Sequence, residues 1–198
     1  MKKYIILIPI YNDRESLTKL IENINSEIKD VNSEISVIVI NDASSQQIID
    51  QYQNTENINS IEIINMRDNK GHARCIASGL KYIFEKKEFD YVIPMDGDGE
   101  DRPEEIKEFI ELAEQSKDQS IIGERTKRSE SLFFKFCYQF HKFLTLAFTG
   151  QSIKFGNFTC LSKSTIERMI NEKSTWNSFS GSLKKIEKNL LFIPSIRG

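Results

Sequence analysis

The sequence predicts an α/β protein in which a mainly parallel, Rossmann-like sheet is flanked by helices. Short apolar runs rich in β-forming residues alternate with segments whose apolar residues recur every three or four positions, as in alternating strands and helices. Three of the four predicted strands end in polar clusters, and open α/β sheets bind ligands at that edge. A chain of 198 residues most simply forms one domain.

Most of this pattern lies in residues 1–123. The helix predicted over 14–28 illustrates the reasoning, because its apolar residues fall on one face at spacings of three and four. Pro103 suits the first turn of a helix, whereas Pro9 and Pro94 each remove a strand hydrogen-bond donor and are expected at strand ends. We expect strands over residues 4–9, 35–40, 61–64 and 91–95, and helices over 14–28, 48–52, 71–86 and 103–115.

After Gly123 the pattern changes. Residues 132–148 combine several aromatic side chains with a polar stripe of Lys135, Gln139 and Lys142. They form either a core helix or an amphipathic helix that lies on a membrane surface or a partner. Elsewhere in this half we expect a basic-rich loop over 124–128, a turn over 155–158 and a helix over 163–170, and we assign no element from 180 onwards.

Composition excludes several classes of protein. A net charge of −2 and the lack of any basic block give no reason to expect nucleic acid as a partner. Cys75, Cys137 and Cys160 are odd in number and far apart, which is typical of reduced thiols in a cytoplasmic protein. The apolar run after Lys3 is too short for a signal peptide, and no run of about 18 apolar residues could span a membrane.

Four carboxylates, those of Asp96, Asp98, Glu100 and Asp101, follow the strand predicted at 91–95. Crowded carboxylates repel one another unless a cation neutralises them, and their oxygens suit Mg²⁺ or Mn²⁺. Such a site usually holds its metal through one or two carboxylates and the phosphates of a substrate. The alternative is a solvated acidic turn that caps the helix beginning at Pro103.

Three known motifs compete for this acidic segment. An EF-hand loop is excluded, because its sixth and twelfth positions would be Asp101 and Lys107 rather than Gly and Glu. Phosphatases of the haloacid dehalogenase type carry a similar Asp-x-Asp, but on their first strand. They also need carboxylates further on, and Asp118 is the only Asp after Asp101 in this chain. The third motif is the Asp-x-Asp of nucleotide-sugar glycosyltransferases.

Taken together, the motifs resemble those of the family 2 inverting glycosyltransferases, which have the GT-A fold. Pro9–Asp13 is similar to the opening Pro-x-Tyr-Asn-Glu of that family, and Val39–Ser44 is similar to its Val-Asp-Asp-Gly-Ser, with Asn41 and Ala43 substituted. The resemblance covers residues 4–160. Its remaining matches are the Asn-x-Gly helix start at Asn69–Arg74, the metal motif at Met95–Pro103, the Gly-x-Arg at Gly123–Arg125 and the acceptor-side segment Phe155–Phe158.

The resemblance implies a role for each matching residue. Residues 1–123 would form the half that binds the nucleotide sugar, and 124–198 the acceptor side, shortened at its C-terminal end. Asp96, Asp98 and Arg125 would be catalytic, with Asp98 and Glu100 as ligands of Mg²⁺ or Mn²⁺. His72 and His141 are expected to be ordinary surface or turn histidines. The residues expected to bind the donor substrate are Pro9, Tyr11, Asp13, Asp42, Gly71, Arg74 and Asp96.

The implied reaction transfers a sugar, with inversion, from a nucleoside diphosphate to an acceptor, while the metal stabilises the departing diphosphate. A hydroxyl acceptor needs a general base. The family usually places it in an acidic pair in the second half, and in that region this chain offers only Glu187, with no acidic neighbour. A phosphate acceptor needs none, and the chain most resembles the polyprenyl-phosphate glycosyltransferases, such as dolichol-phosphate mannose synthase. A cell-surface glycan precursor is the other acceptor considered.

The alternative function is a catalytically silent module that binds nucleotide sugars. We expect a cytoplasmic protein, peripheral to the inner membrane face if the acceptor is a lipid.

Overall fold

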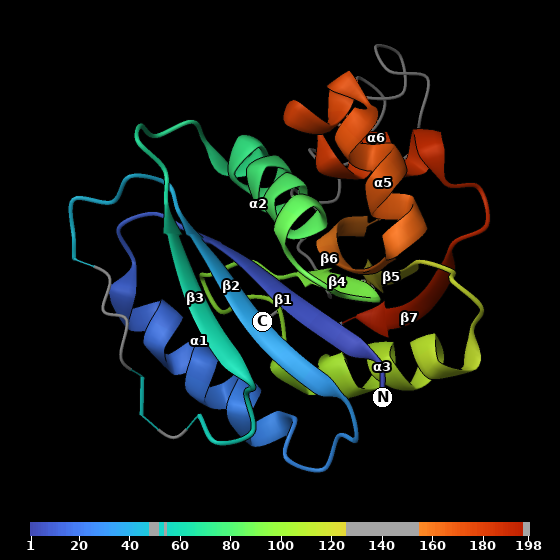
Figure 1. Ribbon diagram of the computed structural model, residues 1–198, viewed down its shortest axis with the longest axis horizontal. Coiled ribbons are helices and arrows are strands. Elements are labelled where there is room, and N and C mark those ends of the chain that lie inside the picture. Colours follow the sequence, from blue (N-terminus) through green and yellow to red (C-terminus); the bar gives the residue numbers. More distant parts are fainter. Residues whose placement is uncertain (48–51, 54, 126–154, 196–198) are drawn as a thin grey trace, which may run out of the picture.

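The computed structural model describes residues 1–47, 52–53, 55–125 and 155–195. Within these residues one mixed sheet has the strand order β3-β2-β1-β4-β6-β5-β7 (Figure 1). Its strands are β1 (Lys3–Ile10), β2 (Glu34–Asn41), β3 (Ser60–Asn65), β4 (Tyr91–Pro94), β5 (Ile121–Arg125), β6 (Phe155–Ser162) and β7 (Leu191–Ser195). The helices are α1 (Arg14–Glu27), α2 (His72–Lys86), α3 (Ile106–Gln115), α5 (Lys163–Asn171) and α6 (Phe179–Ile186), with short 3₁₀ helices η1 (Pro103–Glu105) and η2 (Lys173–Trp176).

The sheet is parallel in its first half and mixed in its second. Strand β1 pairs in parallel with β2 and β4, and β2 pairs in parallel with β3. Strand β6 runs antiparallel to both β4 and β5, and β5 pairs in parallel with β7. The predicted α/β class with a mainly parallel sheet is therefore confirmed.

Alternate side chains of β1 enter two separate hydrophobic layers, as the twofold period of a strand requires. Tyr4, Ile6 and Ile8 belong to the cluster that includes residues of α1 and α3. Ile5 and Leu7 belong to the cluster formed with α2, α5 and α6. The sheet is thus covered by α1 and α3 on one face and by α2, α5 and α6 on the other (Figure 1). Both faces of β1 are buried, which explains its nearly unbroken apolar sequence.

The predicted strands and helices of the described first half are present, and no end is shifted by more than one residue. Pro94 is the last residue of β4, and Pro9 is the second-to-last residue of β1. Both lie at strand ends, as predicted from the backbone N–H that proline lacks. The helix predicted from Pro103 begins with the 3₁₀ turn η1 before α3. The predicted helix at 48–52 and the aromatic segment 132–148 lie largely or wholly outside the described residues.

Two predictions for the second half are wrong, and a third segment, which was given no element, is structured. Residues 155–158 do not form a turn but begin β6, where Phe155 and Phe158 are buried in different layers. Glu124 and Arg125 belong to β5 rather than to a loop. The segment left unassigned from 180 onwards contains the rest of α6 and strand β7. Each of these segments is stabilised by pairing with distant strands or by packing on the sheet, which local sequence signals do not reveal.

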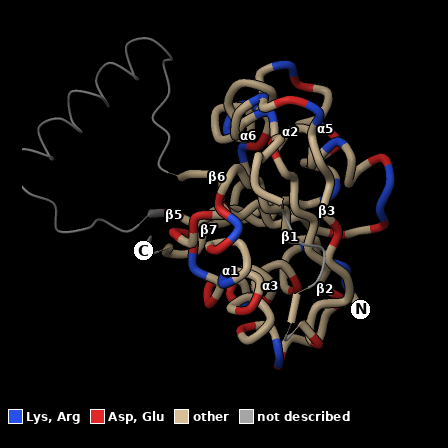
Figure 2. The backbone as a smooth tube through the Cα atoms, turned by 90° about the vertical axis from the view of Figure 1, so that its left-hand side faces the viewer, with Lys and Arg blue, Asp and Glu red and all other residues tan. Residues whose placement is uncertain are grey.

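Charged residues lie mainly on helices and loops, while the traces of the central strands carry few of them (Figure 2). Cys75 and Cys160 are free and buried. Among the described residues no helix has the length and apolar character needed to cross a membrane.

Candidate active site

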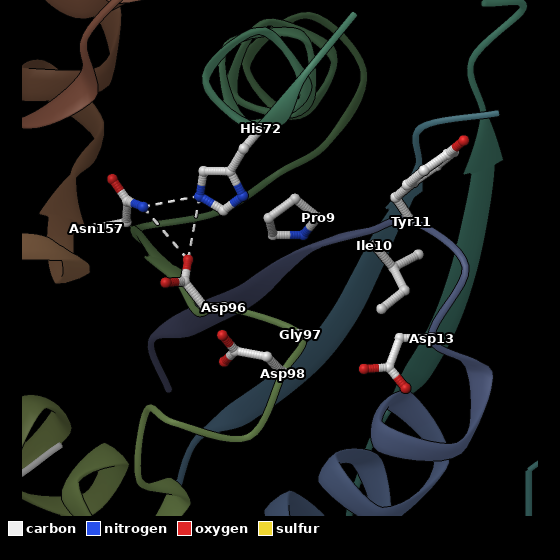
Figure 3. Close-up of a pocket in the computed structure, with 9 residues that line it drawn as sticks. All are labelled: Pro9, Ile10, Tyr11, Asp13, His72, Asp96, Gly97, Asp98 and Asn157. Atoms are coloured by element: carbon white, nitrogen blue, oxygen red, sulfur yellow. Dashed lines mark hydrogen bonds and ion pairs between the residues drawn. The ribbon is translucent and has the colours of Figure 1, made fainter. Parts of the chain in front are cut away.

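A cavity of about 350 Å³ opens where β1 and β4 end. Two predicted site segments, those after β1 and β4, share its lining with His72 and Asn157, as the close-up in Figure 3 shows. The lining residues are Pro9, Ile10, Tyr11, Asp13, His72, Asp96, Gly97, Asp98 and Asn157. Two of the polar clusters predicted to share one crevice, those after β1 and β4, therefore do so.

The backbone holds the loop after β4 tightly against β1. Met95 donates to the carbonyl of Leu7 at 3.0 Å, and the backbone N–H of Asp96 donates to Asp101 Oδ2 at 2.8 Å. A Cβ atom on Gly97 would lie 2.9 Å from the carbonyl oxygen of Pro9, a distance that real Cβ atoms do not reach. Only glycine fits at this position. Its lack of a side chain lets the backbone between Asp96 and Asp98 pack directly on β1.

The four carboxylates of this loop have different environments. Asp101 is buried and accepts the hydrogen bond that closes the loop, whereas Asp98 and Glu100 are exposed. Asp98 also accepts from the backbone N–H of Glu100 at 3.0 Å. Asp96 is 15% exposed at its side chain and lies between the buried and the exposed acids. The loop is therefore more than a solvated acidic turn, because two of its acids are largely enclosed by the fold.

Asp96 contacts two polar side chains that lie on other elements. His72 Nε2, on the first residue of α2, lies 3.1 Å from Asp96 Oδ1. Asn157 Nδ2, on β6, donates to the same oxygen at 3.3 Å and lies 2.8 Å from His72 Nε2. The hydrogen bond to Asp96 raises the pKa of His72, and the charges of Asp96, Asp98 and Asp101 act in the same direction against the effect of burial.

His72 and Asn157 line the cavity, but the sequence did not identify either of them as a site residue. His72 was expected to be an ordinary surface or turn histidine, yet it faces the cavity and pairs with Asp96. Asn157 lay in the segment predicted as a turn. Its place on β6 depends on antiparallel pairing with β4, whose partner residues lie about 70 positions away, and the sequence carries no local signal for that pairing.

Tyr11 and Asp13 form the wall of the cavity that follows β1. Tyr11 is 53% exposed, so its ring is available to a ligand. Asp13 caps α1 by accepting from the N–H of Ser16 at 3.2 Å. Asn12 adopts a left-handed conformation at φ 53° and joins this loop to the one after β2, donating its N–H to Ser44 Oγ at 2.8 Å.

Other residues predicted for the site lie outside the cavity. Asp42 is buried, and its two carboxylate oxygens accept from the backbone N–H groups of Lys70 and Gly71, each at 2.8 Å. Its expected contact with a base or ribose stays a prediction, because in this structure the carboxylate holds the loop before α2. Gly71 has φ +85°, a conformation that favours glycine. Arg74 is exposed on α2.

The topology places Arg125 and Asp96 at the same edge of the sheet. Strand β5 runs antiparallel to β6, which in turn runs antiparallel to β4, so β5 and β4 point the same way. Arg125 is the last residue of β5, and Asp96 follows the end of β4. This is the edge where open α/β sheets bind ligands.

The donor set fits a hard divalent cation bound together with a phosphate ligand. No group of three or more His, Cys, Asp or Glu side chains among the described residues is arranged to hold a metal by itself. Asp96 and Asp98 do face one cavity, and Mg²⁺ commonly uses one or two carboxylates plus substrate phosphates. Carboxylate oxygens also suit Mn²⁺.

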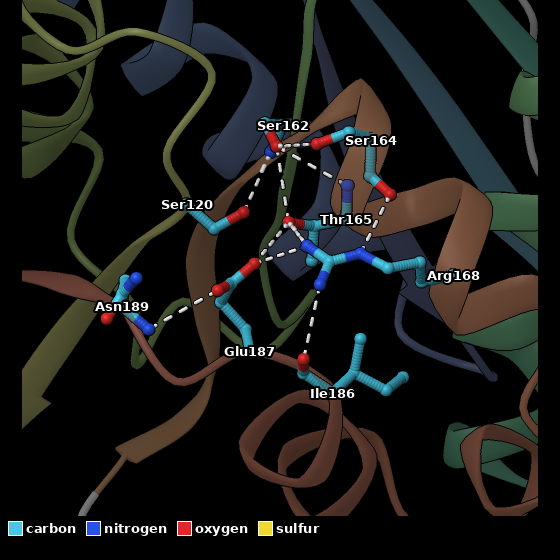
Figure 4. A network of polar contacts seen from close by, with 8 residues as sticks. All are labelled: Ser120, Ser162, Ser164, Thr165, Arg168, Ile186, Glu187 and Asn189. Atoms are coloured by element: carbon cyan, nitrogen blue, oxygen red, sulfur yellow. Dashed lines mark hydrogen bonds and ion pairs between the residues drawn. The ribbon is translucent and has the colours of Figure 1, made fainter.

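Glu187 belongs to a separate polar network that joins α5 to the segment before β7 (Figure 4). It pairs with Arg168, accepts from Thr165 Oγ1 at 3.3 Å and accepts from the backbone N–H of Asn189 at 3.3 Å. Burial acts to raise its pKa, but the hydrogen bonds from Arg168 and Asn189 outweigh it, and the pKa is lowered. Glu187 does not line the cavity, and its contacts are those of a structural ion pair.

Comparison with known proteins agrees with the sequence motifs and the fold. The profile of the family described as "Glycosyl transferase family 2" matches residues 5–177. An undecaprenyl-phosphate 4-deoxy-4-formamido-L-arabinose transferase from Photorhabdus laumondii is 30% identical over 89% of this chain and 54% of its own length. The protein of the same name from Proteus mirabilis is 30% identical over 81% of this chain and 48% of its own. The chain thus spans about half the length of these relatives.

Solved structures share the GT-A fold at low sequence identity. The mannosyltransferase PcManGT from Pyrobaculum calidifontis, in complex with GDP-Man and Mn²⁺, superposes with a TM-score of 0.67 at 14% identity, over 98% of this chain and 56% of that one. Residues 1–349 of S. aureus TarS in complex with UDP give a TM-score of 0.63 at 14% identity, over 98% of this chain and 59% of that one.

Proposed function

Because the chain belongs to glycosyl transferase family 2, we propose that it is an inverting glycosyltransferase. It transfers a sugar from a nucleoside diphosphate to an acceptor, for which a polyprenyl phosphate is the first candidate and a glycan precursor the second. The observation that carries this proposal is the cavity at the ends of β1 and β4, where Tyr11, Asp13, Asp96 and Asp98 face one space. Its volume of about 350 Å³ suits a small-molecule ligand.

In this proposal the two halves of the chain bind different substrates. Residues 1–123 bind the nucleotide sugar, and residues 124–198 contribute the acceptor side. Tyr11 and Asp13 hold the nucleoside with Pro9, while Asp42 and Gly71 shape the neighbouring loop and give the ligand access to the backbone. Arg74 and Arg125 supply positive charge for the diphosphate, and the place of Arg125 at the same sheet edge as Asp96 supports its part.

Asp98 and Glu100 hold a divalent cation, Mg²⁺ or Mn²⁺, and Asp96 faces the ribose and the ion. When bound, the ion stabilises the negative charge that develops on the leaving diphosphate. Tight packing of Gly97 against Pro9 holds the segment that carries Asp96 and Asp98, so the loop needs little rearrangement when the donor binds. Exposure of Asp98 leaves its carboxylate accessible to the ion.

A phosphate acceptor agrees with the contacts of Glu187, the acid considered as a general base in the second half. A phosphate oxygen is already ionised near neutral pH and needs no general base, whereas a hydroxyl does. Glu187 is engaged with Arg168 and lies outside the cavity. The relatives named as undecaprenyl-phosphate transferases support a polyprenyl phosphate for this chain as well.

A turnover assay tests this proposal. The chain is incubated with Mn²⁺ and with UDP-, GDP- or dTDP-sugars, with and without undecaprenyl phosphate, and both released nucleoside diphosphate and glycosylated lipid are measured. We expect release that depends on the lipid phosphate for at least one donor. Binding of a nucleotide sugar without transfer to any acceptor would instead favour the silent binding module.

A further inference from the structure

Three side chains from distant parts of the chain meet at one carboxylate oxygen of the cavity. Asn157 Nδ2 and His72 Nε2 approach Asp96 Oδ1 at 3.3 and 3.1 Å. His72 begins α2 and Asn157 belongs to β6, so the contact joins the two halves of the chain. Figure 3 shows both side chains directed at Asp96 from one side of the cavity.

The hydrogen-bonding chemistry favours two donors on this oxygen. The amide nitrogen of Asn157 can donate hydrogen bonds but cannot accept them. If His72 Nε2 accepted one of them, it would be unprotonated and could not donate to Asp96. The 3.1 Å contact fits an Nε2–H that donates to Asp96, either in the imidazolium or in the neutral tautomer protonated on Nε2. Both nitrogens then donate to Oδ1, and hydrogen bonds to an ionised acceptor are among the stronger ones.

The backbone at Asp96 is fixed independently of these contacts. Its N–H donates to the buried Asp101 at 2.8 Å, and the next residue, Gly97, packs against the carbonyl of Pro9. What the backbone leaves open is the rotation of the Asp96 side chain. Two donors at Oδ1 are suited to restrict that rotation.

We propose that His72 and Asn157 are positioning residues that hold the carboxylate of Asp96 in the orientation that binds the donor substrate. This inference rests on the proposed function, since it assumes that a nucleotide sugar occupies the cavity. Outer partners of the groups in a metal site typically change metal affinity or activity by 10- to 100-fold. Loss of either partner should therefore weaken Mn²⁺-dependent binding of a nucleoside diphosphate by about tenfold.

Calorimetry with UDP and GDP, in the presence of Mn²⁺, compares the wild type with His72→Ala and Asn157→Ala. His72→Gln is the conservative variant, because its amide nitrogen can donate in place of Nε2. Arg67→Ala is the control, since that side chain is 94% exposed and does not line the cavity. Uridine and guanosine, which lack the diphosphate, are titrated in parallel, and melting temperatures are recorded for every variant.

We expect both alanine variants to bind the preferred nucleoside diphosphate more weakly, with nucleoside binding and melting temperature unchanged. The glutamine variant and the control should bind close to the wild-type affinity. Wild-type affinity in both alanine variants would overturn the positioning role and leave the proposed function intact. Equal losses for nucleoside and diphosphate, with lower melting temperatures, would show a merely structural contact and overturn it too. If the wild type binds neither UDP nor GDP, dTDP is titrated as well; if it binds none of the three, the proposed function fails and the inference falls with it.

Discussion

At the scale of single residues, the four acids after β4 are chemically alike but differ in environment. Asp101 is buried and accepts the backbone N–H of Asp96 at 2.8 Å. Asp101→Ala should lower the free energy of unfolding by about 1–3 kcal/mol, because it leaves an enclosed donor without its acceptor. Asp101→Asn keeps an acceptor and should cost less. Urea denaturation measures both, and equal stability of the alanine variant and the wild type would contradict this account of the loop.

The pKa of His72 reports on the same site. Since the hydrogen bond to Asp96 raises it, Asp96→Asn should lower the pKa of His72. A raised folded-state pKa means that the protonated His72 adds to stability below the unfolded-state value of about 6.5, and that this contribution disappears as the pH rises through the folded-state pKa. An NMR titration can follow the imidazole, because the chain has only two histidines and His141→Gln assigns the second signal. An unchanged pKa in Asp96→Asn would contradict the contact.

Sequence reasoning placed Tyr11, Asp13, Asp96 and Asp98 near one another because each follows the end of a predicted strand, and in the structure all four line the cavity. It could not place His72, whose contact with Asn157 spans 85 residues. A histidine at the start of a helix is common on protein surfaces. Only the pairing of β6 with β4 reveals its partner.

At the scale of elements, the turn between β4 and η1 contains two glycines with different roles. Gly97 packs against the backbone of β1, whereas Gly99 has open space around it but adopts φ +79°. Gly97→Ala should therefore displace the loop, weaken nucleotide binding and cost about 1–3 kcal/mol of stability, as overpacking does. Gly99→Ala is the matched control and should show only the smaller cost of a strained φ. If both variants bind nucleotide and unfold alike, close packing at Gly97 is not what holds the loop.

The helices and strands of the first half were predictable because each carries its own periodicity. Helix α1 buries Leu17, Leu20, Ile21 and Ile24 at spacings of three and four. Strand β6 was not predictable in the same way, since Gly156 and Asn157 are residues that favour turns. Its pairing with β4 and β5 overrides that preference. The conformation at Ala43 is another departure, with φ 59° at a position where the resembling motif has glycine.

At the scale of the whole molecule, the parallel part of the sheet follows from alternating strands and helices, but the antiparallel part does not. The order β4-β6-β5-β7 depends on pairings between segments far apart in sequence. These pairings bring Asn157 to the cavity and Arg125 to the edge that carries Asp96. The two halves proposed from the motifs therefore both contribute strands to one sheet.

The acceptor proposal predicts binding to a membrane surface. The aromatic segment 132–148 carries Lys135 and Lys142, which could meet anionic headgroups, and apolar area removed from water contributes about 25 cal/mol per Å². We expect the chain to float with liposomes that contain anionic lipid at low salt, and Phe134→Ser with Phe148→Ser to reduce that fraction. A wild-type chain that stays with the soluble fraction would remove the main support for a lipid acceptor.

The central claim is that the cavity binds a nucleotide sugar with the help of a divalent cation. Calorimetric titration with UDP-, GDP- and dTDP-sugars, with and without Mn²⁺, tests it most directly. Asp98→Ala is compared with the wild type, and Glu108→Ala, which removes an exposed carboxylate on α3, is the control. The account predicts that the wild type and the control bind at least one donor only when Mn²⁺ is present, and that Asp98→Ala loses this binding while unfolding as the wild type does. Failure of the wild type to bind any donor, or unchanged Mn²⁺-dependent binding by Asp98→Ala, would contradict it.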